Sequence, residues 1–351
     1  MKTGTDTRPV RSRCSNGPDF PAQAGCRTDA AKERDSMRRI RPIAVALQGV
    51  VMLIAAIGWG SALAGSPGEA GLLSLRLGVG AREAGMGDAG LATSTGAAAI
   101  YWNPANNVLG GDFETELALQ HQRYLGLFNQ EAAVVAHRVG RGVLGFMFTG
   151  FYSDDIDRYV GPDEGPTGIW QGKFRPYDVV LGVSYAMPLG KSFAIGVTGK
   201  MIYEKIDIYS DTGFALDIGI THKAVIRGLV FAANVTNLGK DMQLKDDPIP
   251  LPRAYRLGAA WSPPDFASGK FTVAGDVIMP RDGQEKAHLG SEYRMVPELS
   301  LRLGTHVNYE SQGLTAGAGF RTGVLALDYA YSQWTEDGFD DGHRFTLRLI
   351  W

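Results

Sequence analysis

Apolar and polar residues alternate along most of the chain after residue 110. Near the very end, Phe345, Leu347, Leu349 and Trp351 alternate with Arg344, Thr346 and Arg348. Such alternation sends apolar side chains to one face of a strand and polar side chains to the other. We therefore predict about fourteen strands, near residues 113–123, 129–139, 142–152, 175–187, 192–204, 212–222, 227–238, 252–262, 270–279, 285–295, 298–309, 313–321, 323–333 and 342–351.

The length of these segments favours strands that cross a membrane. Most have about ten to thirteen residues, whereas a strand in a soluble protein averages about five or six. A tilted strand needs roughly nine to eleven residues to cross a bilayer. A soluble β-sandwich is the alternative, but its polar faces would carry many Lys and Glu residues. Here the polar faces are rich in Gly, Ala, Ser and Thr.

The links between segments alternate in length. Short links such as 140–141 and 188–191 follow even-numbered segments, and longer ones such as 153–174, 239–251 and 334–341 follow odd-numbered segments. Outer-membrane barrels have short periplasmic turns and longer outer loops. We therefore predict an all-β fold, a transmembrane antiparallel β-barrel over residues 111–351 with both ends in the periplasm.

Aromatic residues near strand ends agree with a barrel in a membrane, because they form girdles at both interfaces. The residues that we assign to these girdles are Tyr152, Tyr185, Tyr203, Tyr255, Trp261, Tyr309, Tyr331 and Trp351. The final strand, with Phe345, Leu347, Leu349 and Trp351, resembles the C-terminal signal that directs outer-membrane barrels to their assembly machinery. Outer-membrane lipid, lipopolysaccharide and that machinery are therefore expected partners.

The N-terminal region predicts export. Arg38, Arg39 and Arg41 precede an apolar stretch that ends at Ala62-Leu63-Ala64. A basic start, an apolar middle and small residues at the cleavage point describe a secretory signal over 37–64. An uncleaved membrane anchor is the alternative. Residues 1–36 are polar and rich in Arg, so we interpret them as a mis-called extension.

Cleavage after Ala64 changes the charge and the available chemistry. Ten of the 35 basic and five of the 37 acidic residues lie before Gly65, so the mature chain carries a net charge of −7. Both cysteines, Cys14 and Cys26, are also removed, which excludes a thiolate metal site or nucleophile. The acidity argues against nucleic-acid binding. The six histidines and the serines form no metal-binding or nucleophile motif. We therefore expect the protein to bind no metal and no cofactor and not to be an enzyme.

The segment 65–110 does not follow the strand pattern. It contains Gly80-Ala81-Arg82, then Gly85-Met86-Gly87, an Ala-rich stretch, and Tyr101-Trp102-Asn103-Pro104-Ala105. In this order and spacing the motifs resemble the start of the PorV/PorQ family, which is similar in turn to the long-chain fatty-acid transporter (FadL) superfamily. The resemblance implies a fourteen-stranded barrel with this segment folded inward as a hatch. It makes Arg82, Gly85, Met86, Gly87, Asn103, Pro104 and Ala105 the hatch motif residues.

Three functions follow from the resemblance. We rank slightly ahead a role as a docking or shuttle component for exported proteins, as PorV-like proteins serve in type IX secretion. A FadL-like channel for hydrophobic small molecules such as fatty acids is the alternative, and it requires an apolar lumen pocket near Asn103. A structural barrel without cargo is the third. The hatch itself either only fills the barrel or also gates it.

Isolated charges on the polar strand faces predict ion pairs in a narrow lumen, because buried charges need partners. The residues are Asp217, Asp276, Asp328, Arg256, Glu292, Arg294, Arg302, Arg344 and Arg348. We expect Arg82 to pair with an inward carboxylate such as Asp217, Asp276 or Asp328. Two acidic loops, around 154–164 and 336–341, suit either calcium or solvent, and their spacing matches no defined calcium loop.

The signal assignment predicts the first residue of the mature protein. N-terminal sequencing of protein purified from the envelope should begin at Gly65. A first residue before Met37 would refute both the cleavage and the mis-called extension.

Overall fold

The computed structural model describes residues 71–161, 168–245, 247–264 and 269–351. The predicted extension 1–36, the signal 37–64 and the first hatch residues 65–70 lie outside the described residues and remain predictions. None of the helices in the described segments is both long and apolar enough to cross a membrane.

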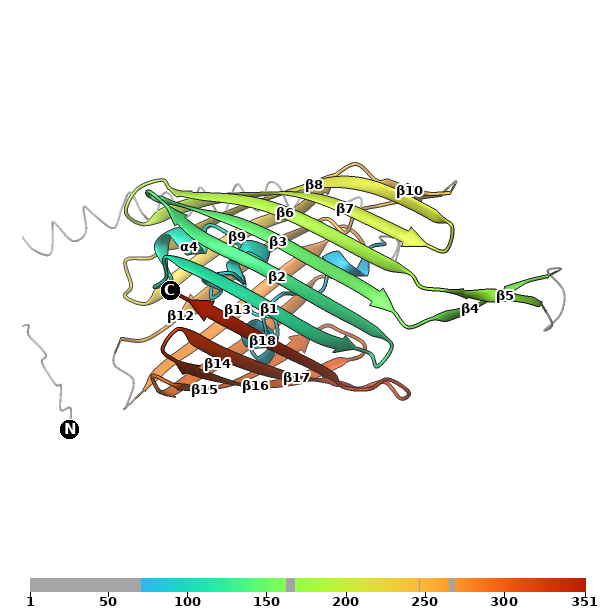
Figure 1. Ribbon diagram of the computed structural model, residues 1–351. Helices are drawn as coiled ribbons and strands as arrows, with labels where there is room; N and C mark the ends of the chain where they lie inside the picture. Colours follow the sequence, from blue (N-terminus) through green and yellow to red (C-terminus); the bar gives the residue numbers. More distant parts are fainter. Residues whose placement is uncertain (1–70, 162–167, 246, 265–268) are drawn as a thin grey trace, which may run out of the picture. The chain divides into compact units, whose positions relative to one another are not determined.

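Fourteen antiparallel strands close into one barrel (Figure 1). The strands are β1 Thr115–Tyr124, β2 Phe128–Val139, β3 Gly142–Ser153, β6 Tyr177–Pro188, β7 Phe193–Ile206, β8 Tyr209–Lys223, β9 Leu229–Gly239, β12 Ala254–Trp261, β13 Lys270–Pro280, β14 Lys286–Val296, β15 Leu299–Val307, β16 Gln312–Thr322, β17 Leu325–Trp334 and β18 Gly342–Ile350. Each overlaps one predicted segment, so the fourteen-stranded barrel predicted from the sequence is confirmed. The first and last strands pair with each other, from Glu116 opposite Ile350 to Arg123 opposite His343.

Side chains alternate between the two faces of the barrel wall as the sequence pattern predicts. In β6, Leu181, Val183 and Tyr185 are exposed on the outside, while Val180 and Ser184 are buried inside. An apolar outer surface around a closed sheet is the fold of a transmembrane barrel. A sandwich of two open sheets is excluded, because one closed sheet contains all fourteen strands.

The two longest links are not simple loops. The link after β3 contains the hairpin β4 Ile156–Val160 and β5 Ile169–Phe174, and the link after β9 contains the hairpin β10 Met242–Leu244 and β11 Asp247–Ile249. Pairing satisfies backbone groups that a long loop would leave to solvent. Both hairpins lie at the same end of the barrel, which we call the loop end. The opposite end, with Thr115 and Ile350, is the terminus end.

The segment that precedes β1 lies inside the barrel. It forms four short helices: η1 Leu73–Leu75, α2 Ala81–Gly85, α3 Ala99–Trp102 and α4 Asn106–Leu109. Its apolar residues Val79, Ile100 and Trp102 belong to a buried cluster with wall residues such as Val134 and Ile202. We call residues 71–114 the hatch.

One predicted girdle residue lies elsewhere. Tyr309 does not face outward at the end of β15 but lines a cavity inside the barrel, where its hydroxyl is 2.7 Å from His288 Nε2. The preceding Asn308 has a left-handed backbone conformation, and β15 has already ended at Val307. The chain therefore leaves the strand pattern before Tyr309, and the alternation no longer fixes its direction.

The register predicts the effect of a charge on the outer face. Leu347 lies opposite Leu119 on β1 and Leu327 on β17, among exposed apolar side chains. Leu347→Arg should destabilise the barrel in a bilayer by roughly 2–4 kcal/mol, because the guanidinium would face hydrocarbon. Heat-modifiable gel mobility and unfolding in lipid vesicles measure this loss. Leu347→Phe, the control, should change little, and equal stability of both variants would contradict the facing of β18.

Candidate functional site

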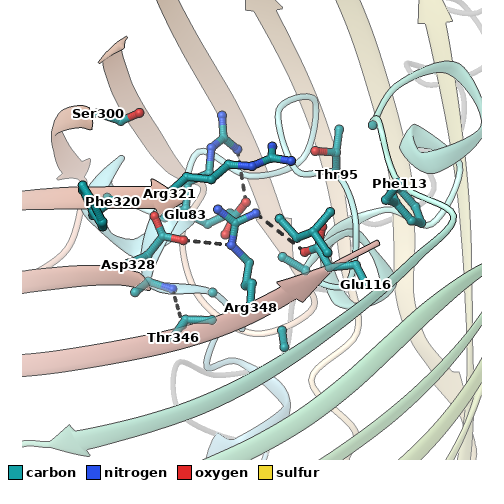
Figure 2. A pocket seen from close by; sticks show the side chains of 18 of the residues that line it. Glu83, Thr95, Phe113, Glu116, Ser300, Phe320, Arg321, Asp328, Thr346 and Arg348 are labelled. Carbon is teal, nitrogen blue, oxygen red and sulfur yellow. Dashed lines mark hydrogen bonds and ion pairs between the residues drawn. The ribbon is translucent and has the colours of Figure 1, made fainter. Parts of the chain in front are cut away.

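The hatch separates two cavities inside the barrel. The terminus-end cavity has a volume of about 140 Å³ and is lined by Phe113, Glu116 and Arg348 among others (Figure 2). The loop-end cavity has a volume of about 620 Å³ and is lined by Tyr124, Trp334 and Tyr309 among others. The two share no lining residue, and hatch residues contribute to both. The hatch therefore forms the boundary between them.

A network of buried charges ties α2 to the barrel wall. Glu292 on β14 accepts hydrogen bonds from Arg82 Nε (2.9 Å) and Nη2 (3.0 Å) and from Arg302 Nε (2.8 Å). Asp328 on β17 then pairs with Arg302 (2.7 Å) and with Arg348 (2.9 Å). Figure 2 shows Arg348 between Asp328 and Glu116, its second partner at 3.7 Å. Two further members, Glu83 and Arg294, balance the network at four cations and four carboxylates.

Arg82 pairs with an inward carboxylate, as predicted, but its partners are Glu292 and Glu83 and not the three aspartates named as examples. Asp217 and Asp276 lie on β8 and β13, away from the strands that α2 contacts, and Asp328 is paired with Arg302 and Arg348. Burial alone would lower the pKa of Arg82, but the charges of Glu292 and Glu83 outweigh it and raise the pKa above its ordinary value. Arg82 is therefore a permanent cation.

A second connection joins the hatch to the loop-end half of the wall. Asp88 accepts a hydrogen bond from His306 Nε2 at 3.2 Å and lies 3.6 Å from Arg344, while its backbone oxygen is 2.9 Å from His288 Nδ1. Burial would raise the pKa of Asp88, but the His306 hydrogen bond and the Arg344 charge outweigh it and hold the pKa well below its usual range. Asp88 thus stays ionised from neutral pH down to below the usual carboxyl range. The sequence did not link either histidine to Asp88, because they lie 200 and 218 residues further along the chain.

Glycines of the wall allow the hatch to approach the strands closely. A Cβ at Gly290 or Gly304 would come within 2.1 Å of hatch backbone at Met86 or Gly87, and one at Gly317 would lie 3.0 Å from Gly85 Cα. Real Cβ atoms do not reach such distances, so larger residues at Gly290 and Gly304 would displace the hatch. The wall glycines and the Gly85-Met86-Gly87 motif are therefore complementary surfaces.

The second half of the hatch motif docks on the other side of the lumen. Asn103 is fully buried and donates from Nδ2 to Thr221 Oγ1 (3.0 Å) and to the Ile220 carbonyl (3.1 Å). Its Oδ1 accepts from the Ala105 backbone, and Pro104 and Ala105 lie against Gly196. Asn103 lines neither of the two cavities. Asn103 itself is therefore used for anchoring, while the adjacent Trp102 lines the loop-end cavity.

The other predicted lumen charges also face the interior. Lys200 pairs with Asp217 at 2.5 Å, and Asp276 accepts from the Leu91 backbone at 2.8 Å. Arg256 lies over the Trp102 ring, 5.6 Å from its centroid. Sequence alternation placed these residues on the inner face but did not identify Lys200 as a partner.

The acidic loops are engaged by other groups within the described residues. Asp154 pairs with Arg123 (3.0 Å), Asp155 with Arg175 (3.0 Å), and Asp341 accepts from the Tyr331 hydroxyl and the Trp334 backbone. Asp163 and Glu164 lie outside those residues. The part of the chain that the structure describes holds no group of three or more His, Cys, Asp or Glu side chains arranged for a metal ion.

Solved structures share this fold. The toluene transporter TbuX of Ralstonia pickettii matches with a TM-score of 0.57 and 15% identity, over 80% of this chain and 100% of that chain. The toluene transporter TodX of Pseudomonas putida matches with a TM-score of 0.57 and 11% identity, over 78% and 99% of the two chains. At these identities the likeness shows the fold alone. No known family and no curated protein matches the sequence.

The charge network predicts a large effect from one carboxylate. Glu292→Gln would leave Arg82 and Arg302 buried with one partner fewer, and breaking a buried pair costs about 3–5 kcal/mol. We expect a lower unfolding free energy in urea, together with a larger ion conductance of the barrel in planar bilayers as α2 loosens. Glu298→Gln is the matched control, because Glu298 is exposed and lines the terminus-end cavity. Indistinguishable behaviour of the two variants would show that the network does not hold the hatch.

Proposed function

We propose that the protein is an outer-membrane channel through which small hydrophobic molecules enter the cell, and that it is not an enzyme. The loop-end cavity carries this proposal. Its volume of about 620 Å³ lies within the range of small-molecule sites. The fold shared with two proteins described as toluene transporters supports the same function.

The walls of the loop-end cavity suit a small apolar ligand. Leu75 and Leu77 of the hatch, Ile278 of β13 and the rings of Tyr124 and Trp334 all line it. Tyr124 and Trp334 meet edge to face, with ring centroids 5.2 Å apart. A ligand entering from the loop end therefore meets aromatic surface first and the hatch at the bottom.

Passage then requires the hatch to shift. Its α2 side is held by ion pairs in the Arg82–Glu292 network and by close contacts of small residues with the wall, and its Asn103 side by hydrogen bonds and by packing of large apolar side chains. Ion pairs re-form readily after a small displacement in a wet lumen, whereas the large side chains on the Asn103 side would need to repack. We propose that the α2 side moves and that the Asn103 side remains attached, so that the hatch gates the barrel as well as filling it.

The proposal places the loop end outside the cell and the terminus end in the periplasm, after export by the 37–64 signal and insertion by the barrel-assembly machinery. Phe345, Leu347 and the other residues of the C-terminal pattern would serve as the assembly signal. The docking role in type IX secretion, first among the expectations from the sequence, has less support than the channel, because the likeness is to transporters. The PorV/PorQ resemblance remains a prediction.

Uptake by whole cells tests the channel. A deletion strain in which expression of the protein has been restored should take up labelled toluene or a labelled long-chain fatty acid several-fold faster than the deletion strain itself. Ala254→Phe should reduce the gain, because Ala254 is buried and lines the loop-end cavity. The outward-facing Ala259→Phe is the matched control.

Two results would contradict the channel. One is unchanged uptake combined with loss of surface proteins from the envelope, which would favour docking. The other is equal uptake by the Ala254→Phe and Ala259→Phe variants when both fold, as judged by heat-modifiable mobility.

A further inference from the structure

We propose that the loop-end cavity selects small aromatic carboxylates, and that Arg256 is the residue that binds the carboxylate. The inference rests on the proposed function and narrows its substrate class. It goes beyond a purely hydrocarbon ligand because the cavity contains a cation that the protein leaves without a carboxylate.

Arg256 differs from the other two arginines that line the cavity, while Lys286 lies over the Tyr309 ring. Arg76 pairs with Asp282 at 2.7 Å, and Arg344 donates to Gln122 at 2.8 Å and lies 3.6 Å from Asp88. Among the described residues, Arg256 has no carboxylate within ion-pair distance, and its buried Nε atom has no hydrogen-bond partner. It lies on β12, and its guanidinium is held over the Trp102 ring.

Neither acidic residue near Arg256 forms an ion pair with it. Asp276, on the neighbouring strand, accepts a hydrogen bond from the Leu91 backbone. Asp88, on the hatch, is bound by His306 and lies next to Arg344. Both carboxylates reduce the positive potential at Arg256, but neither offers it the two oxygens of a bidentate pair, which a guanidinium binds best. The carboxylate of a ligand can occupy that position beside the guanidinium.

The aromatic surfaces stand where the ring of such a ligand would lie. The Trp102 ring is fixed by its indole N–H, which donates to the Val79 carbonyl at 2.7 Å. Tyr309 is fixed by His288 and, like Trp102 and Arg256, lines the same cavity. An aromatic ring would contact these side chains while its carboxylate met the guanidinium.

A neutral hydrocarbon would bind the same surfaces less well. It would displace water from Arg256 without replacing the hydrogen bonds, and an unpaired buried charge is costly. A site with such a polar group discriminates strongly against analogues that lack the matching group. The cavity should therefore prefer an aromatic acid over a neutral molecule of the same shape.

Equilibrium dialysis of the purified full barrel in detergent tests the preference, with labelled benzoate, benzyl alcohol and hexanoate as probes. Benzoate should bind at least about tenfold more tightly than benzyl alcohol, because a hydrogen bond to a charged group is worth about that factor or more. It should also bind more tightly than hexanoate, which has the charge but no ring. Arg256→Gln should lower the benzoate-to-benzyl alcohol preference about tenfold. Arg256→Lys should keep part of it, since the charge remains but the fork is lost.

Arg253→Gln is the matched control, because Arg253 lies three residues earlier and does not line the cavity. Equal binding of benzoate and benzyl alcohol, or equal preferences of the Arg256→Gln and Arg253→Gln proteins when both show heat-modifiable mobility, would overturn the inference. Hexanoate bound as tightly as benzoate would overturn the aromatic part. If cells take up toluene but benzoate is not preferred, this inference fails and the channel stands. If benzoate is preferred but no uptake occurs, the channel fails and the binding site stands.

Discussion

The structure depends on one constraint, which is that every backbone N–H and C=O of a bilayer-crossing sheet needs a partner within the sheet. The pairing of β1 with β18 meets this requirement by closing the sheet. The backbone hydrogen bonds continue to the last residue, Trp351, which bonds with Thr115. Closure with fourteen strands leaves a lumen too wide for wall side chains alone to fill. The hatch fills that space with its apolar side chains and its backbone. The wall in turn packs against these side chains and hydrogen-bonds the hatch backbone.

The two sides of the hatch are held by different interactions. Near β14–β18 the contact combines a neutralised network around Glu292 and Asp328 with close packing of small residues. Near β3 and β6–β8 it is apolar and hydrogen-bonded, through Ile100, Trp102 and Asn103. Buried ion pairs give little net stability but are sensitive to the loss of either partner. The network therefore fixes the position of α2 more than it stabilises the barrel.

The strands and their facing could be predicted because a period of two is a local property. Leu347 and Thr346 reveal their faces from their neighbours alone, and the inner position of Glu292 follows in the same way. The partners could not be predicted, because they depend on the depth and rotation of the hatch. Arg82 meets Glu292, which lies 210 residues away, and not the three aspartates that were expected. His288, His306 and Asp88 come together for the same reason. Tyr309 was misplaced because it lies just beyond the end of its strand.

The wall glycines show that the barrel and the hatch constrain each other. A glycine weakens a strand, because it has no side chain to pack. At Gly290, Gly304 and Gly317 this loss is offset, since hatch backbone at Gly85, Met86 and Gly87 takes the place of the missing side chains. Had the lumen been merely a water-filled channel, nothing would keep these inward positions free of larger residues. Their spacing on β14, β15 and β16 follows the path of the Gly85-Met86-Gly87 turn. The inner surface is therefore shaped to hold this segment in one position.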